Sequence, residues 1–462
     1  MSERHRKPYE DVLDLVGWTP LVRLKRVTEG LRTPVFGKCE FMNPGGSVKD
    51  RIGRAIVEDA ERTGGLVPGG TIVEATSGNT GLALAMAAVA KGYRCIFTMP
   101  DKMSQEKVKL LRAFGAEVVI TPTAVEPDHP DHYLQKAKRI AAETPGAVLA
   151  DQFYNPANPE AHYRTTGPEL WEQTEGRITH LVAGAGTGGT ITGASRYLKE
   201  KNSAVQVLGV DPFGSVLAPF FHTREMPKGE PYQVEGLGND KIPGALDLDL
   251  VDDYVTVRDR ESFLMARRLT REEGLFVGGS SGLIVQAAVD LARRLDDPEA
   301  LIVAILCDWG EHYLTKVYDD EWMRSNGYLA VERQSVAQLL GTKKDTGPDL
   351  VSATPSTPVR AALSAITTHD VSQLPVILEG ECVGSVTEGE LMAKVLEDPS
   401  ILEASVEGVM EPPFPVVDDH TPAEQLTRLL SRTNAAVLVR ENGAIAGIVT
   451  RFDLVRMLTG AA

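Results

Sequence analysis

The chain has 462 residues, of which 42% are hydrophobic and 24% are charged, and its formal net charge at pH 7 is −16. This length predicts about two or three globular domains, and the acidic balance argues against nucleic acid or an anionic membrane as the main partner. No apolar run approaches the roughly 20 residues that span a bilayer, and the charged N-terminus lacks the apolar stretch of a signal peptide. We therefore expect a cytoplasmic protein.

From residue 35 to about residue 210, strand-like runs alternate with helical patterns. The strand-like runs are Val35–Phe41, Thr71–Glu74, Arg94–Met99, Glu117–Ile120, His180–Ala183 and Val205–Val210. Helical patterns such as Ser104–Phe114 and His132–Glu143 lie between them. This alternation predicts right-handed βαβ units and an α/β fold with doubly wound, mostly parallel sheets. Ligands of such sheets bind beyond the carboxyl ends of the strands.

Residues 43–51 read NPGGSVKDR, a turn that ends the first of these strands and leads into a helical pattern from about Asp50. Lys49 lies at this junction. Burial and nearby cations lower the pKa of a lysine and make it a nucleophile and a base, as a Schiff-base lysine requires. A surface lysine after a tight turn explains these nine residues equally well.

Two further stretches combine a strand, a loop of small polar residues and a helix start. Residues 74–81 read EATSGNTG, and residues 184–193 read GAGTGGTITG. Both place backbone N–H groups and hydroxyls at a helix N-terminus, where an anion binds favourably. Together with the lysine junction they resemble the fold-type II enzymes of pyridoxal 5′-phosphate (PLP), the tryptophan synthase β family. Within it they are similar to the cystathionine beta-synthases and cysteine synthases, over roughly residues 12–329.

The resemblance implies PLP as the cofactor and Lys49 as the catalytic residue, which binds PLP as a Schiff base and, once released, removes the α-proton of the substrate. The other expected cofactor contacts are Asn79 at the ring hydroxyl, Ser280 at the pyridine nitrogen, and Gly186, Thr187, Gly188, Gly189 and Thr190 at the phosphate. The expected substrate contacts are Thr76, Ser77, Gly78, Thr80, Gln152, Tyr154 and Gly236.

Several features depart from relatives in the resembling family. Asn239 stands where animal and yeast cystathionine beta-synthases often carry a tyrosine, and Trp309 replaces a small hydroxyl residue. Animal enzymes bind haem through a Cys and a His in an N-terminal extension, but here only His5 and no Cys precedes the core. We therefore expect no haem. The four cysteines are scattered and show no zinc-ligand spacing, so we expect free thiols and no metal site.

Beyond a polar linker at 328–349, an internal repeat is visible. Thr357-Pro358 recurs as Thr421-Pro422, and the GSVT of 384–387 recurs as the GIVT of 447–450. Each half predicts elements in the order β-α-β-β-α, and the pair resembles a tandem CBS-domain (Bateman) module. The predicted division is a catalytic core at 1–327, the linker, and a regulatory module at 350–462 with repeats at about 350–400 and 404–462.

The module resembles those that bind S-adenosylmethionine or an adenine nucleotide. Thr450 and Asp453 in the second half match the residues that contact phosphate or sugar and ribose, whereas the first half pairs Thr387 with Glu390. A purely structural dimerisation module is the alternative. The resemblance also implies a homo-oligomer, a dimer or larger, that pairs through the catalytic core.

For the whole chain the resemblance implies β-replacement: L-serine and L-homocysteine give L-cystathionine and water, on the transsulfuration route to cysteine. The nonapeptide at 43–51, the DKMSQEK at 101–107 and the C-terminal pair favour this carbon–oxygen lyase. One alternative is a cysteine synthase acting on O-acetylserine and sulfide, which residues 161–171 resemble more closely. The others are a serine or threonine dehydratase and a non-catalytic protein that senses adenine nucleotides.

Overall fold

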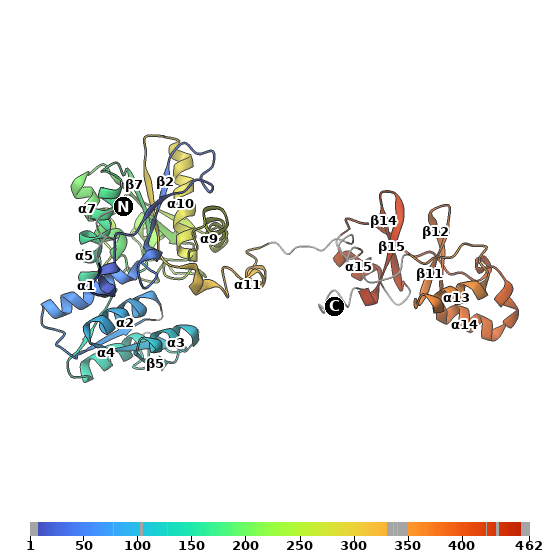
Figure 1. Cartoon of the computed structure of the whole chain (residues 1–462), viewed down its shortest axis with the longest axis horizontal. Helices are drawn as coiled ribbons and strands as arrows, with labels where there is room; N and C mark the ends of the chain where they lie inside the picture. The colour runs from blue at the N-terminus through green and yellow to red at the C-terminus, as the bar shows by residue number, and fades with distance from the viewer. Residues whose placement is uncertain are drawn as a thin grey trace. The chain divides into compact units, whose positions relative to one another are not determined.

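A computed structural model describes the chain except for residues 1–7, 77, 102–104, 127, 330–335, 337–339, 341–349, 422, 431–433 and 454–462. The chain divides into two compact units, Met1–Ala330 and Val331–Ala462, and each is described here by itself (Figure 1). Within the described residues, no helix combines the length and the apolar character needed to cross a bilayer.

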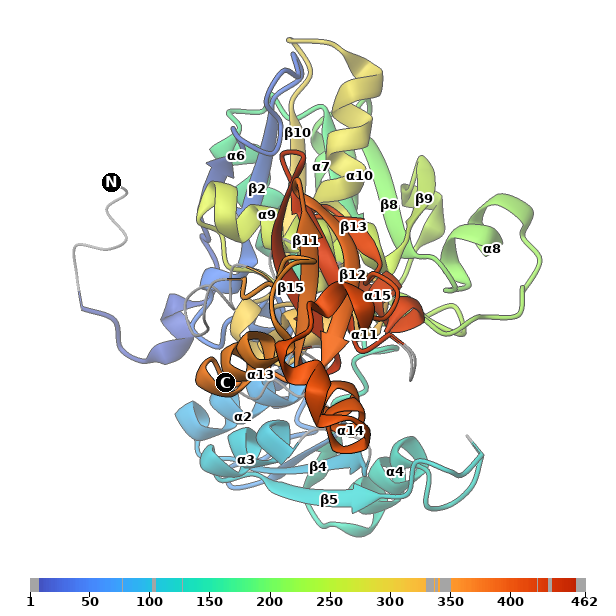
Figure 2. The ribbon, with the colours of Figure 1, turned by 90° about the vertical axis from the view of Figure 1, so that its right-hand side faces the viewer.

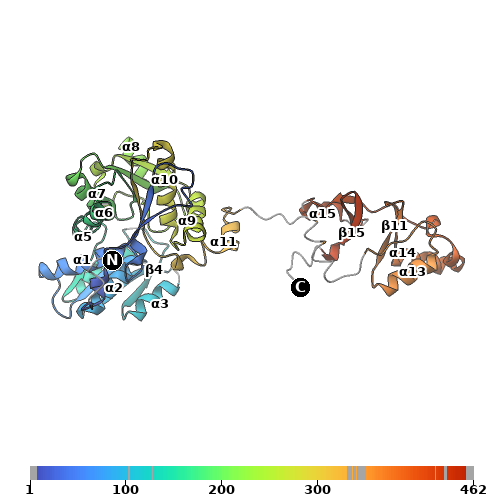
Figure 3. The same ribbon diagram turned by 45° about the horizontal axis from the view of Figure 1, so that its top comes forward.

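The larger sheet of the first unit has six strands. Their order is β1 (Leu21–Arg23), β2 (Val35–Cys39), β10 (Ile302–Leu306), β7 (His180–Gly184), β8 (Gln206–Pro212) and β9 (Asp253–Val257). Only the pairing of β1 with β2 is antiparallel. Helix α7 (Gly189–Lys201) covers one face and α10 (Gly279–Leu295) the other (Figure 3). Strand β10 is apolar throughout and fully buried, because helices cover both faces of a parallel sheet.

A second sheet of four parallel strands has the order β5 (Glu117–Thr121), β4 (Arg94–Pro100), β3 (Thr71–Ala75) and β6 (Ala147–Leu149). Its helices are α1 (Lys49–Arg62), α2 (Asn79–Lys91), α3 (Gln105–Ala113) and α4 (Tyr133–Glu143). Helices α2 and α3 lie beside β4 and β5 (Figure 2). The predicted α/β fold with mostly parallel sheets is confirmed, and each of the strands predicted between residue 35 and about residue 210 is present to within two residues at either end.

The remaining helices of the first unit are α5 (Ala157–Arg164), α6 (Thr166–Gln173), α8 (Leu217–Thr223), α9 (Asp259–Glu273) and α11 (Asp320–Ser325). Helix α6 takes part in a buried ion network. Glu169 binds Lys38 of β2 at 2.6 Å and Arg51 of α1 at 2.6 Å, and Arg51 also binds Glu40 at 2.6 Å. All four side chains are at most 3% exposed. Because Arg51 lies two residues after Lys49, the network fixes the first turn of α1.

The second unit contains the predicted repeat. In the first half α13 (Val359–Thr368) precedes the hairpin of β11 (Gln373–Leu378) and β12 (Glu381–Thr387) and α14 (Glu388–Glu397). In the second half β13 (Val416–Asp418) and α15 (Ala423–Leu429) precede the hairpin of β14 (Ala436–Glu441) and β15 (Ala444–Thr450). The first strand expected in the first half is reduced to one bridge, Ala353 with Val376. Both hairpins have an irregularity at the same place, after Val376 and after Val439.

Candidate active site

Two adjoining cavities open where the carboxyl ends of strands from both sheets meet. The inner cavity has a volume of ≈ 40 Å³ and the outer cavity ≈ 340 Å³. Both are lined by Lys49, Asn79, Gly186, Thr187, Gly236 and Leu237. The structure therefore brings together the lysine junction and both glycine-containing loops singled out in the sequence.

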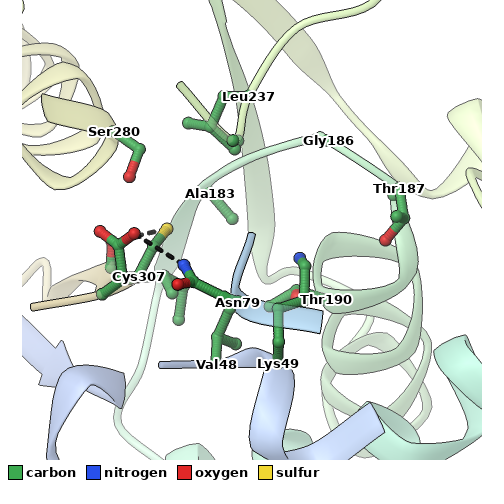
Figure 4. Close-up of a pocket in the computed structure, with 15 residues that line it drawn as sticks. Val48, Lys49, Asn79, Ala183, Gly186, Thr187, Thr190, Leu237, Ser280 and Cys307 are labelled. Carbon is green, nitrogen blue, oxygen red and sulfur yellow. Dashed lines mark hydrogen bonds between the residues drawn. The ribbon is translucent and has the colours of Figure 1, made fainter. Parts of the chain in front are cut away.

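Lys49 is the first residue of α1, and its side chain rises into the inner cavity (Figure 4). Two contacts hold this junction at the end of β10: the Val48 N–H donates to the Cys307 carbonyl at 2.8 Å, and the Trp309 N–H donates to the Gly46 carbonyl at 3.1 Å. Burial lowers the pKa of Lys49, and only part of this effect is opposed by Cys307 and Asp308. The buried amine is thus suited to act as a nucleophile and a base.

The loop between β7 and α7 forms the opposite wall of the inner cavity. The first N–H groups of a helix have no acceptor within it and attract anions. Asn158 Nδ2 donates to Thr187 Oγ1 at 2.9 Å, so the Thr187 proton is directed elsewhere. Gly188 has φ +86°, and a Cβ on Gly189 would lie 1.8 Å from Asn158 Oδ1. This close-packed, glycine-dependent loop fits a phosphate.

Thr190 is held by a side chain that the sequence did not point to. Its hydroxyl lies 3.1 Å from His162 Nε2, and His162 Nδ1 lies 2.8 Å from the Thr166 hydroxyl. Burial lowers the pKa of His162 well below its ordinary value, and the charges of Arg51 and Lys49 add to this effect. His162 is therefore neutral and connects the loop between β7 and α7 to α6.

Asn79, the first residue of α2, is oriented by Asp308. Its Nδ2 donates to Asp308 Oδ2 at 2.8 Å, and the Tyr313 hydroxyl donates to the same oxygen at 2.6 Å. Burial raises the pKa of Asp308, and its Oδ1 has no hydrogen-bond partner in the described part of the chain. The sequence suggested no role for Asp308. The sequence signal that could have indicated a role is its position two residues after β10, at the carboxyl edge of the sheet where ligands bind.

Ser280 near the start of α10 also lines the inner cavity. Its hydroxyl lies across the cavity from Thr187 and Thr190, with Lys49 between them (Figure 4). A neutral hydroxyl at one end, an anion-binding loop at the other and an amine between them match the pyridine nitrogen, phosphate and aldehyde of PLP. The lining residues fit this cofactor.

Most of the expected substrate contacts line the outer cavity: Thr76, Gly78, Thr80, Gln152 and Gly236. Thr80 Oγ1 donates to Gln152 Oε1 at 2.6 Å, and Gln152 Nε2 donates to Glu74 Oε1 at 3.3 Å. These bonds leave a set of neutral polar groups at the wall. Ser77 lies outside the described residues.

Tyr154 does not join this set, contrary to the expectation that its side chain faces the cleft. Tyr154 is 54% exposed, and its ring lies against Gly244 and has the Lys241 amine 5.9 Å from its centre. The turn that begins at Asp151, with φ +46°, places Gln152 and Phe153 at the cavity, whereas Tyr154 is not among the residues that line it.

The two departures from the family pattern have structural roles. The Asn239 amide donates a short hydrogen bond to the carbonyl of Gly186, which ties the loop at 236–239 to the phosphate loop. Trp309 packs edge-to-face on Phe41 with ring centres 5.6 Å apart, and it covers the turn at Gly46.

In the second unit, Thr450 and Asp453 contact each other directly. Asp453 Oδ2 accepts hydrogen bonds from the Thr450 N–H at 2.7 Å and from the Thr450 hydroxyl at 2.8 Å. Thr387 and Glu390 repeat the side-chain contact at the start of α14, at 2.9 Å. Both pairs have the geometry of helix caps.

Comparisons with known proteins agree with this division of the chain. The family model "Pyridoxal-phosphate dependent enzyme" matches residues 12–308, and the model "CBS domain" matches residues 345–397 and 406–460. A protein from Dictyostelium discoideum named cystathionine beta-synthase is 40% identical, over 97% of this chain and 92% of its own length. Proteins of the same name from Saccharomyces cerevisiae and Oryctolagus cuniculus are 41% and 39% identical, over 88% and 97% of this chain and 85% and 84% of their own lengths.

Proposed function

Because the chain belongs to the pyridoxal-phosphate dependent enzymes and, over nearly its full length, to the cystathionine beta-synthase family, we propose that it converts L-serine and L-homocysteine to L-cystathionine and water. The observation that carries this proposal is the buried Lys49 amine between the phosphate loop and Ser280. The alternatives from the sequence, a cysteine synthase, a dehydratase or a non-catalytic sensor, are not favoured by these relatives.

When bound, PLP supplies an electron sink that stabilises negative charge at the substrate α-carbon. Lys49 Nζ would be the atom that holds the cofactor covalently. With the amino acid bound, the neutral Lys49 amine would take the α-proton of serine and later return a proton to the same carbon. The β-hydroxyl of serine would gain one proton and leave as water, and the thiol would lose its proton as its sulfur forms the new bond to the β-carbon.

The other residues of the site are proposed to hold and orient the cofactor and the substrate. The Gly186–Thr190 loop is proposed to bind the phosphate, Asn79 the ring hydroxyl and Ser280 the pyridine nitrogen. A neutral partner at that nitrogen leaves it unprotonated, which limits charge delocalisation into the ring. The substrate carboxylate is proposed to contact Thr76, Ser77, Gly78, Thr80 and Gln152, whose groups are neutral donors. Gly236 would border the same site, and Tyr154 is left out because of its placement.

The assignment of Lys49 is tested by the variant Lys49→Ala. It should lose the visible absorption band of the bound cofactor and form cystathionine about 10²- to 10⁴-fold more slowly. Lys109→Ala, which removes an exposed lysine of α3, is the control and should keep both. A Lys49→Ala protein that is yellow and fully active would contradict the assignment.

The C-terminal CBS pair is a regulatory ligand-binding module. We propose that its ligand is S-adenosylmethionine or an adenine nucleotide at Thr450 and Asp453, that the chain forms a dimer or a larger homo-oligomer, and that it works in the cytoplasm without haem. Isothermal titration of the full chain with S-adenosylmethionine and with adenine nucleotides tests whether the module binds them. If none of these ligands produces heat or shifts the unfolding temperature, the proposal is contradicted.

A further inference from the structure

Two oppositely charged side chains, Lys107 and Glu235, line the outer cavity, and Glu235 also binds a second lysine outside it. Glu235, in the segment between α8 and β9, binds Lys107 of α3 at 2.7 Å through Oε2 and Lys316 at 2.7 Å through Oε1. Lys107 lies on α3, beside the four-stranded sheet, whereas Lys316 follows β10 of the six-stranded sheet in the chain. The Lys107–Glu235 pair therefore joins the two halves of the first unit across the cavity.

The rest of the wall is nearly uncharged. Among the described residues that line the outer cavity, only Lys49, Lys107 and Glu235 belong to residue types fully charged at neutral pH, and His312 is the one histidine. Lys49 is engaged by the cofactor, and the wall near it presents neutral groups such as Thr80 and Gln152. The outer cavity thus has one positive and one negative side chain besides Lys49, and neither of them lines the inner cavity.

Stability does not account for this pair. Lys107 and Glu235 are 25% and 28% exposed, and ion pairs with such access to water contribute about 0–1 kcal/mol to folding. Burial alone would raise the pKa of Glu235, but Lys107 and Lys316 hold it below its ordinary value, so the carboxylate is charged at neutral pH. Because Lys316 binds the other oxygen, Glu235 keeps a cation partner when Lys107 takes a new anion.

We infer that Lys107 and Glu235 bind the α-carboxylate and the α-ammonium group of the second substrate, a zwitterionic amino-acid thiol. This inference rests on the proposed function and deepens it. Two opposite charges are what an amino acid requires at its α-carbon, with its thiol directed inward to the reacting end. Sulfide, the nucleophile used by a cysteine synthase, has neither a carboxylate nor an ammonium group that Lys107 and Glu235 could bind.

The test compares Lys107→Met with Lys109→Met, which removes an exposed lysine from the same helix. Steady-state rates are measured with serine and each of four thiols: homocysteine, 3-mercaptopropionate, cysteamine and 2-mercaptoethanol. Lys107→Met should raise the KM for homocysteine about 10- to 100-fold and lower the rate with 3-mercaptopropionate. It should leave the reaction with 2-mercaptoethanol and the KM for serine unchanged. Glu235→Gln should act on homocysteine and cysteamine instead.

A second readout separates recognition from a merely structural role. The spectral titration with serine alone should be the same in wild type and Lys107→Met. Equal losses with all four thiols, or a weaker serine titration, would overturn the inference and make the pair a structural bridge. If the wild type forms no cystathionine at all, the proposed function fails; if it does and Lys107→Met matches it, only this inference fails.

Discussion

The side-chain amide of Asn79 donates a 2.8 Å hydrogen bond to the carboxylate of Asp308, which joins residues 229 positions apart in sequence. Asn79 begins α2, which follows β3 of the four-stranded sheet, and Asp308 follows β10 of the six-stranded sheet. The bond therefore couples the halves of the first unit at the cofactor site and fixes which way the Asn79 amide faces.

We predict that Asp308→Ala weakens PLP binding about 10- to 100-fold, because the Asn79 amide loses the acceptor that orients it. Titration of the cofactor-free protein with PLP, followed by visible absorption, measures this. Tyr313→Phe removes the other donor to Asp308 and leaves the Asn79 bond, so it should have a smaller effect. Equal affinities for wild type and Asp308→Ala would contradict this role.

The catalytic core should function without the C-terminal module. The C-terminal end of the core can be placed to within two residues. The ring of Tyr328 packs on Phe263 and on Trp322 of α11, with ring centres 5.0 and 5.7 Å apart. A chain ending at Leu329 keeps these contacts and should form cystathionine. A chain ending at Gly327, the limit proposed from the sequence, should unfold at a lower temperature. A folded but inactive chain ending at Leu329 would show that the division is misplaced.

The fold and the core of the site could be predicted because their signals are local. Strand patterns, the lysine junction and the glycine loop each lie within about ten consecutive residues. The partners that orient them are distant in sequence: His162 reaches Thr190, and Asp308 reaches Asn79. Such contacts depend on how strands are ordered in the two sheets, which periodicity does not encode. The position of Tyr154 outside the cavity lining has a related reason, since the turn at Asp151, with φ +46°, is not visible in the periodicity.

Breaking the buried ion network should destabilise the protein strongly, because it leaves charges buried without a partner. Glu169→Gln leaves Lys38 and Arg51 without their shared carboxylate in a buried site, so we predict a loss of about 3–5 kcal/mol in the free energy of unfolding. Glu58→Gln breaks the half-exposed pair with Arg54 and should cost at most about 1 kcal/mol. Denaturant unfolding measures both. Equal losses would mean that the network adds no more than a surface pair.

The stability of the protein should fall as pH rises through neutrality, partly because of Glu74. Burial raises the pKa of Glu74 from its ordinary value of 4.5 to about 8, so the folded state keeps a proton that the unfolded state releases. Between these values unfolding releases a proton, and the free energy of unfolding therefore decreases with increasing pH. Glu74→Gln should flatten this decrease, most visibly from pH 7 to 8, above the pKa of about 7 of Asp50. Glu58→Gln should not change the slope, and an unchanged slope in Glu74→Gln would contradict the prediction.

The most direct test of the account is product analysis by mass spectrometry. The purified full-length protein is incubated with L-serine and homocysteine and, separately, with O-acetylserine and sulfide. We predict that cystathionine forms much faster than cysteine, since the cavity beside Lys49 carries the charged pair of Lys107 and Glu235. Cysteine from O-acetylserine as the dominant product would contradict the account and make the chain a cysteine synthase with a regulatory module.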